Sequence, residues 1–257
     1  MTETNLRILL LNPNMTEAVT DLMAASGRSA AAAGTEIVPI TASRGMPYIS
    51  TRAEAQIGGA IALEMLAEHD DSIDGAIIAA FGDPGLLGAR ELFDFPVIGV
   101  SEAAMLMACM LGRRFAIVTF STSLVGWYRD CVELNGFKDR CAGIHALDLP
   151  FADVADDANG NSDLLVELAG EVIRDSGADS LIFGGAPLAG LAAKSRDRIP
   201  VPIVDPVAAA VKQAEALIAL KLRKAVAGSF RRPTAKTTAG LAPRLAARIE
   251  HREELAL

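Results

Sequence analysis

The stretch GAIIAAFGDPGLLGARELFDFPVIGVSEAA, residues 75–104, contains two short apolar runs rich in Ile and Val, separated by a glycine and proline turn and an amphipathic segment. A second stretch, DSLIFGGAPLAGLAAKSRDRIPVPIVDPVAAA at 179–210, lines up with it, and RILLLNPN at 7–14 lines up with RFAIVTFS at 114–121. The offset stays at about 105 to 107 residues. A constant offset predicts two lobes of one topology related by an approximate two-fold axis.

Short apolar runs between longer Ala-rich stretches are typical of buried parallel strands that alternate with helices. We expect strands at 7–12, 36–40, 75–80, 96–99, 115–119, 143–147, 180–184 and 202–204. We expect helices near 15–32, 52–68, 85–92, 102–111, 123–135, 162–175, 188–195 and 206–227. The predicted fold is therefore α/β, with two similar doubly wound parallel-sheet lobes and a ligand cleft between them.

This pattern also predicts the domain organisation. The first lobe comprises residues 1–100 together with 206–227, and the second comprises 101–205. Residues 228–257 form a C-terminal extension, whose APRLAARIEHREEL stretch is either a final amphipathic helix or a frayed tail. The extension is a candidate contact with a neighbouring subunit, and we expect a homo-oligomer.

Composition limits the classes of partner. The net charge of -8 and the pI of about 5.0 disfavour nucleic acid and anionic membrane as partners, because both repel an acidic surface. Three cysteines without a CxxC pair form neither a disulfide framework nor a zinc site. The apolar run before Asn12 is too short for a signal peptide or a membrane span. We expect a cytoplasmic protein with a small-molecule substrate.

Polar residues follow the first strand of each lobe in matched pairs. Asn12 and Asn14 end one strand, and Thr119 and Ser121 end its counterpart. In open α/β sheets the ligand lies beyond the carboxyl ends of the strands, where amides, hydroxyls and backbone N–H groups suit a carboxylate or a cyclic imide. These residues could instead be ordinary turn formers. Their recurrence in both halves favours ligand binding.

At NPN (12–14), FGDPGL (81–86), PVIGVSEAAM (96–105) and PIVDPVAAA (202–210) the chain resembles hydantoin and allantoin racemases of the aspartate/glutamate racemase superfamily. The resemblance runs from about residue 6 to 238, and FGDPG followed by PVIGVSEA is its most specific part. Members of this superfamily include aspartate and glutamate racemases, maleate isomerase and arylmalonate decarboxylase. The resemblance implies an enzyme that needs neither a metal nor an organic cofactor.

In the racemases, the resemblance implies two cysteines that face each other across the α-carbon, one as thiolate base and one as thiol acid. Here the two positions hold Ala80 and Gly185, neither of which can carry a proton. Ala80 is either native or the product of a cysteine-to-alanine replacement. Pro187 and Leu188 also depart from the family pattern, so the second half-site looks remodelled. We expect Phe81 and Ala186, beside these positions, to contact the ligand.

Two other residues are candidates for catalysis. Asp83 precedes Pro84 at a predicted helix start and is either the N-cap of that helix or a carboxylate at the cleft mouth. Tyr48 lies in the loop after the second strand and either donates a proton to the ligand or covers apolar surface. Cys109, Cys131 and Cys141 fall on the wrong side of their elements for the cleft and are expected to be inert.

The sequence therefore predicts a cofactor-independent enzyme that acts at the carbon next to a carboxylate or cyclic amide carbonyl, but not a two-cysteine racemase. A decarboxylase, lyase or hydrolase on the same scaffold is an alternative. A small-molecule binding protein that kept the cleft and lost catalysis is another. No GxGxxG, GxxxxGK[ST], GxSxG or HExxH motif points to a nucleotide or metal.

Overall fold

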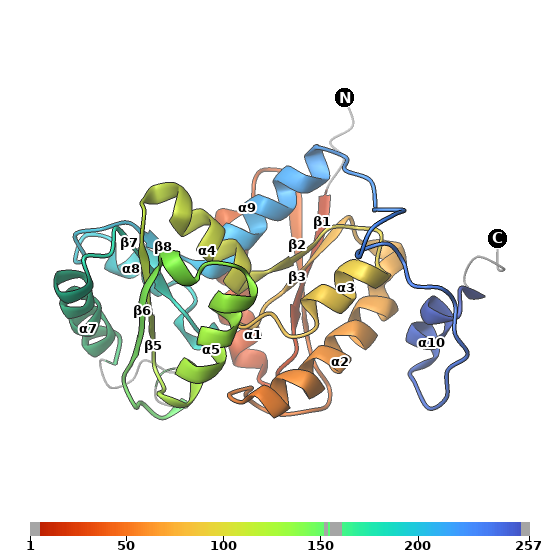
Figure 1. The fold of residues 1–257 in the computed structure, drawn as a ribbon, viewed down its shortest axis with the longest axis horizontal. Coiled ribbons are helices and arrows are strands. Elements are labelled where there is room, and N and C mark those ends of the chain that lie inside the picture. Colours follow the sequence, from red (N-terminus) through yellow and green to blue (C-terminus); the bar gives the residue numbers. More distant parts are fainter. Residues whose placement is uncertain (1–5, 152–153, 155–160, 253–257) are drawn as a thin grey trace.

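The computed structural model describes residues 6–151, 154 and 161–252, which form two parallel four-stranded sheets (Figure 1). The first sheet has the order β2-β1-β3-β4, with β1 Leu6–Asn12, β2 Thr35–Thr41, β3 Gly75–Ile78 and β4 Val97–Gly99. The second has the order β6-β5-β7-β8, with β5 Phe115–Thr119, β6 Cys141–Ala146, β7 Ser180–Phe183 and β8 Ile203–Val204. The identical strand order confirms the two-lobe α/β fold, and every strand end lies within two residues of its predicted position.

Helices cover both faces of each sheet. The long ones are α1 Glu17–Ala30, α2 Arg52–His69, α4 Val100–Leu111, α5 Ser123–Leu134, α7 Asn161–Ser176 and α9 Pro206–Ala219. The short ones are α3 Leu86–Leu92, α8 Leu191–Ser195, α10 Pro243–Ile249 and 3-10 turns at Asp70–Ser72, Lys138–Arg140 and Ala186–Leu188. The helices of the described residues are not long and apolar enough to cross a bilayer.

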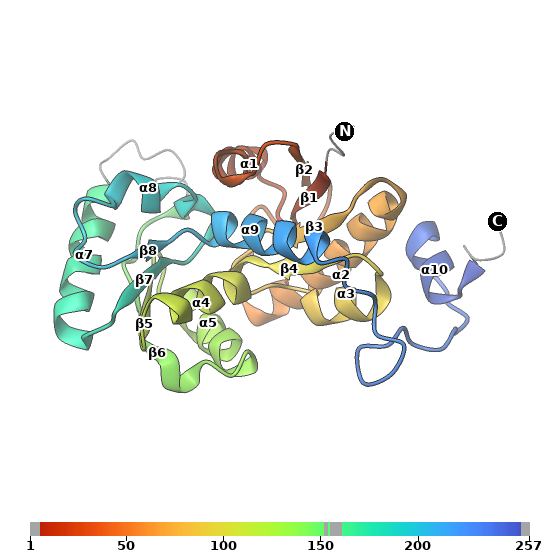
Figure 2. The same cartoon turned by 90° about the horizontal axis from the view of Figure 1, so that it is seen from above.

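The two lobes exchange the helices that follow their last strands. α4 leaves β4 of the first sheet and contacts β5, β7 and β8 of the second. α9 leaves β8 of the second sheet and returns to β1, β3 and β4 of the first, and the two helices pack on each other (Figure 2). Their small buried residues, such as Ala104 and Ala210, let the backbones approach closely. One continuous apolar core therefore runs through both lobes.

Two helix predictions were wrong at their ends. The helix expected at 206–227 ends at Ala219, and Lys221 has a φ of 51° in the left-handed region. Beyond this point Lys224 donates hydrogen bonds to the carbonyl oxygens of Arg90 and Phe93 at the end of α3, which replaces a further helical turn. The helix expected at 188–195 is broken by Gly190, whose φ is 81°, so only Leu191–Ser195 is α-helical.

The chain is irregular from 220 to 242, which includes the start of the predicted extension 228–257, and then forms α10, which packs on α2. Leu245 of α10 joins the apolar cluster that holds Leu66 of α2. Arg244 pairs with Asp71, with 3.0 Å between the guanidinium nitrogen and the carboxylate oxygen. The sequence predicted either a helix or a frayed tail for this stretch, and residues 243–249 form a helix. Residues 253–257 of the predicted extension lie outside the described part.

Candidate functional site

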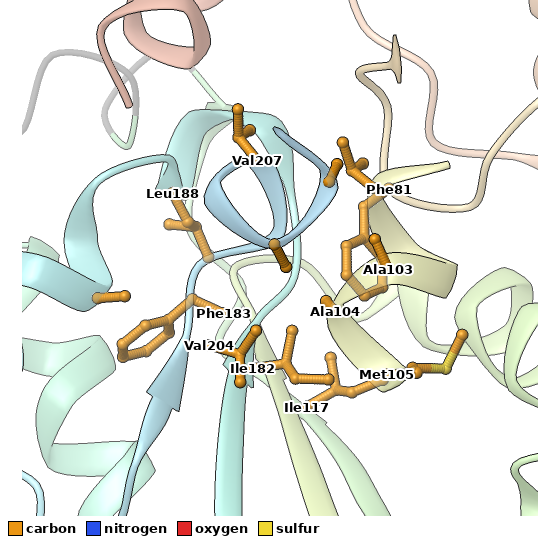
Figure 3. Packing of buried hydrophobic residues seen from close by; sticks show 14 of the residues in the cluster. Phe81, Ala103, Ala104, Met105, Ile117, Ile182, Phe183, Leu188, Val204 and Val207 are labelled. Atoms are coloured by element: carbon orange, nitrogen blue, oxygen red, sulfur yellow. The ribbon is translucent and has the colours of Figure 1, made fainter. Parts of the chain in front are cut away.

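The loops after β3 and β7 meet between the two lobes. A Cβ placed on Gly184 would lie 3.3 Å from the Phe81 ring, which comes from the loop of the other lobe. One small cavity is lined by both loops, and Figure 3 shows the Phe81 ring next to Ala103 at the start of α4. Its lining is apolar: Met23, Ala79, Phe81, Val100, Gly185, Ala186, Ala189, Pro206 and Val207. The space that the centre of a water molecule can occupy in this cavity is about 10 Å³, so the cavity holds at most one water molecule.

Gly185, which the resemblance aligns with the second cysteine of the racemases, has little room for a side chain. Its φ of 130° is a conformation that side chains rarely adopt. A Cβ here would lie 2.9 Å from a ring carbon of Phe120 and 3.6 Å from the hydroxyl oxygen of Tyr128. Phe120 therefore crowds the position that a side chain at 185 would take, and Tyr128 lies at ordinary contact distance from it. Aromatic rings therefore border residue 185, which gives a physical reason for a glycine at this position.

Six aromatic side chains from both lobes fill the space around this position. Their rings form two groups, one with the pairs Phe81–Tyr128 at 4.6 Å and Trp127–Tyr128 at 5.7 Å between centroids, and one with Tyr48–Phe120 at 5.6 Å and Tyr48–Phe151 at 4.6 Å. The set includes both tyrosines and the single tryptophan of the chain. Trp127 also lies against Gly82, where a Cβ would come within 2.2 Å of the indole ring. The two lobes are thus joined by aromatic packing, worth about 0.5–1.5 kcal/mol per ring pair beyond area burial.

Both tyrosines at this site are neutral phenols. Burial raises the pKa of Tyr48 far above its ordinary value, and the negative charge of Glu54 adds to the shift. Burial also raises the pKa of Tyr128, with Thr119 as a hydroxyl neighbour that opposes the shift. The Tyr48 hydroxyl has no hydrogen-bond partner among the described residues. A neutral phenol in an apolar site can donate a hydrogen bond or a proton, but it does not act as a base.

Asp83 is held by the start of α4 and not by the helix that follows it. Its carboxylate accepts hydrogen bonds from the backbone N–H groups of Ser101 at 2.9 Å and Glu102 at 2.8 Å, and from the Ser101 hydroxyl at 2.5 Å. The residue at the N-cap of α4 is Gly99, where a Cβ would lie 2.2 Å from the Asp83 carboxyl carbon. Asp83 therefore caps α4 from a distance, and glycine at 99 leaves room for it.

The cap at Asp83 corrects one of the two alternatives that the sequence left open. α3 begins after Gly85 without a side-chain cap, so Asp83 is not the N-cap of α3. Burial raises the pKa of Asp83 to about 6, although the hydrogen bonds from Ser101 and Glu102 lower it. In the second lobe the capping carboxylate belongs to the N-cap residue itself. Asp205 at the N-cap of α9 accepts hydrogen bonds from the backbone N–H groups of Val207 and Ala208, and from that of Gly190 in the loop after β7.

Cys131 is buried and is not among the residues that line the cavity. Its sulfur lies 3.1 Å from the Ser101 hydroxyl, which connects it to Asp83 across the lobe boundary. The buried face of α5 carries Tyr128 and Cys131, and Tyr128 on this face contacts Phe81 of the first lobe. Burial raises the pKa of the Cys131 thiol to about 12, and the charge of Asp83 adds to the shift. The thiol is therefore protonated and unreactive at neutral pH.

Three of the four polar strand-end side chains, those of Asn12, Asn14 and Ser121, have hydrogen-bond partners inside the protein, whereas the buried Thr119 hydroxyl has none among the described residues. The side-chain oxygen of Asn12 accepts from the backbone N–H of Asn14 at 3.0 Å and from its amide at 2.8 Å, and the side-chain oxygen of Asn14 accepts from the Ile49 N–H at 2.7 Å. This network positions the loop that carries Tyr48. In the second lobe Thr119 is buried, whereas the Ser121 hydroxyl is half-buried and lies 2.9 Å from that of Ser123.

Sequence reasoning missed Phe120, Tyr128 and Ser101. The available signal was the rarity of tyrosine and tryptophan, both of which occur in the GWY segment at 126–128 on the predicted helix face that also holds Cys131. His145 lies in β6, and its buried ring nitrogen Nε2 has no hydrogen-bond partner in the described part of the chain; Asp148 accepts a hydrogen bond from Thr122. Among the described residues, no cluster of three His, Cys, Asp or Glu side chains could hold a metal ion.

Two parallel four-stranded sheets of the same strand order define a two-lobed α/β fold, and comparisons with known proteins show that racemases share it. The solved allantoin racemase from Klebsiella pneumoniae matches with a TM-score of 0.87 and 37% identity over 91% of this chain and 96% of that one. An arylmalonate decarboxylase with a TM-score of 0.58 and 14% identity, covering 95% of this chain and 99% of its own, shares the fold.

Comparisons of sequence identify the family. A hydantoin racemase from Paenarthrobacter aurescens is 34% identical over 233 residues, which cover 90% of this chain and 99% of the relative. The model of the Asp/Glu/hydantoin racemase family matches residues 8–214. The chain belongs to the Asp/Glu/hydantoin racemase family, which confirms the resemblance seen in its strand-end motifs.

Proposed function

We propose that the chain is an enzyme that needs no metal or organic cofactor and acts at the carbon next to a carboxylate or cyclic amide carbonyl of a small molecule. The proposed reaction delivers a proton from one side only. The observation that carries this proposal is the Tyr128 hydroxyl, 3.6 Å from where a Cβ of residue 185 would lie. A phenol thus stands beside the second thiol position, while the first, Ala80, has only a methyl group.

One-sided proton delivery suits a reaction that breaks a bond to a leaving group, such as carbon dioxide. The bond breaks with its electron pair left on the carbon next to the carbonyl, where the carbonyl oxygen delocalises the charge. The Tyr128 hydroxyl then gives its proton to that carbon, and water returns a proton to the phenolate. An apolar wall favours loss of a charged carboxylate as a neutral molecule. Racemisation needs a second group that removes a proton from the opposite face, and Ala80 cannot do so.

The remaining predicted residues have supporting parts in this proposal. Tyr48, with an unpartnered hydroxyl in the same aromatic cluster, donates a hydrogen bond to a substrate oxygen. Asn14 retains one amide N–H beyond the bond to Asn12, and Ser121 is half-exposed at the matching strand end. Asp83 acts through α4 and positions the Phe81 loop without touching substrate. The closed cavity is far below the few hundred Å³ of common ligand sites, so Phe81 and Val207 must separate when substrate enters.

The test uses the purified protein in D2O with 5-substituted hydantoins, allantoin and monosubstituted malonates, followed by proton NMR. We expect turnover of a substrate with a leaving group, with one deuterium incorporated in a single configuration, and background exchange at the α-carbon of the hydantoins. Tyr128→Phe should lower kcat by about 100-fold or more with KM little changed, because it removes a general acid and leaves the ring. Fast exchange in both hydantoin enantiomers would refute one-sided delivery.

The entirely apolar lining of the cavity favours a second candidate function, a binding protein without catalysis. Calorimetric titration separates the two candidates. A ligand from the panel that binds and is never converted supports the second candidate, whereas conversion that Tyr128→Phe abolishes supports the first. If no compound binds or reacts, both are wrong for this ligand class.

A further inference from the structure

The end of the described chain has a charge opposite to that of the rest. Residues 220–249, here called the basic segment, hold eight of the 24 Lys and Arg residues and no Asp or Glu. The remainder of the chain therefore has 16 basic residues against its 32 acidic ones. A separation of this size points to an anionic binding partner for the segment.

Half of these cations are already used within the chain. Lys224 donates to the carbonyl oxygens at the end of α3, Arg232 donates to the carbonyl oxygen of Arg248, Arg244 pairs with Asp71, and Arg248 pairs with Asp94. Four others are exposed and make no ion pair with another described residue: Lys221, Arg223, Arg231 and Lys236. Large apolar side chains are exposed among them: Leu220, Leu222, Val226 and Phe230. A surface that mixes unpaired cations with exposed apolar groups is typical of an interface.

A complementary surface exists on α7. Asp163, Glu167, Glu171 and Asp175 follow one another at intervals of four residues, so they share one face of the helix, and all four are exposed. Asp163 pairs with Arg198, whereas the other three make no ion pair with a described residue. Like charges four residues apart destabilise an isolated helix. Leu164, also exposed, adds an apolar contact beside them.

The two surfaces lie at opposite ends of the molecule in both views. α7 is at the end of the second lobe, and the basic segment with α10 is at the far end of the first (Figures 1 and 2). They cannot meet within one chain. In an antiparallel pair related by a two-fold axis, each basic segment reaches the α7 of the other copy, and the same contact forms twice and closes the assembly. We propose that the acidic face of α7 in a second copy of this chain is the partner of the basic segment.

Charge reversal on the full-length chain tests the pairing by analytical ultracentrifugation. Arg231→Glu with Lys236→Glu should weaken self-association by about tenfold, and so should Glu167→Lys with Glu171→Lys, since a few exposed pairs are removed. Mixing the two variants should restore association in the mixed pair at both contacts, because one contact then carries both reversals and the other carries neither. Glu17→Lys with Asp21→Lys on α1 is the matched control, an exposed acidic pair at the same spacing, and should associate like the parent. Association of the parent should also fall from 50 to 500 mM salt.

Three results would overturn the pairing. A parent chain that stays monomeric at all concentrations has no such contact. Reversals that weaken association equally on α7 and on α1 would indicate a general charge effect. Reversed variants that fail to associate when mixed would place the partner of the basic segment elsewhere, on an anionic molecule of another kind. Circular dichroism of each variant checks that the fold is kept, since all the replaced side chains are exposed.

Discussion

Replacing Gly185 tests directly whether Phe120 fills the second half-site. In Gly185→Ala the new Cβ enters at a φ of 130° and 2.9 Å from the Phe120 ring. The backbone conformation costs about 1–3 kcal/mol for a residue with a side chain, and overpacking costs a further 1–3 kcal/mol. We therefore expect the free energy of unfolding to fall by about 4 kcal/mol. Urea unfolding followed by circular dichroism and by the fluorescence of Trp127 measures it.

A matched control separates the two costs. Gly190 also has a positive φ, 81°, but a Cβ there would meet no atom within 4 Å. Gly190→Ala should therefore show the backbone cost alone, about 1–2 kcal/mol. A double-mutant cycle with Phe120→Ala should recover about 1–2 kcal/mol of the Gly185→Ala loss, because the ring that it strikes is gone. If Gly185→Ala and Gly190→Ala destabilise equally and the cycle shows no coupling, the ring does not occupy the thiol position and the reasoning fails.

Two further predictions concern the lobe boundary. Because burial raises the folded-state pKa of Asp83 to about 6, above the ordinary value near 4, the folded state binds the proton more tightly, so the parent should lose about 2–3 kcal/mol of stability from this group as pH rises from 4 through 6. Asp83→Asn should remove that slope in urea titrations at each pH, and an unchanged slope would contradict the burial of the carboxyl group. The Cys131 thiol, with its pKa raised to about 12, should react with iodoacetamide far more slowly than Cys109 and Cys141 in the folded protein, as peptide mass spectrometry would show; equal rates would place the thiol in solvent.

The sequence alone determined the frame of this protein. Strand positions followed from short apolar runs, because a strand buried on both faces must be apolar along its whole length. The repeat between 75–104 and 179–210 predicted the shared strand order. Ala80 and Gly185 predicted the loss of both thiols, since their neighbours resemble the family pattern closely enough to align them.

Tertiary structure decided which side chains surround Gly185. Phe120 and Tyr128 reach Gly185 from a strand end and a helix that lie more than 50 residues earlier in the chain, and no local pattern encodes contacts of that separation. The partner of Asp83 was hidden for the same reason: its carboxylate caps a helix that starts beyond the next strand, which only the closeness of β3 and β4 makes possible. The end of α9 at Ala219 was likewise settled by Lys224 and the carbonyl groups of α3, because a hydrogen bond between distant segments outweighs weak helix propensity.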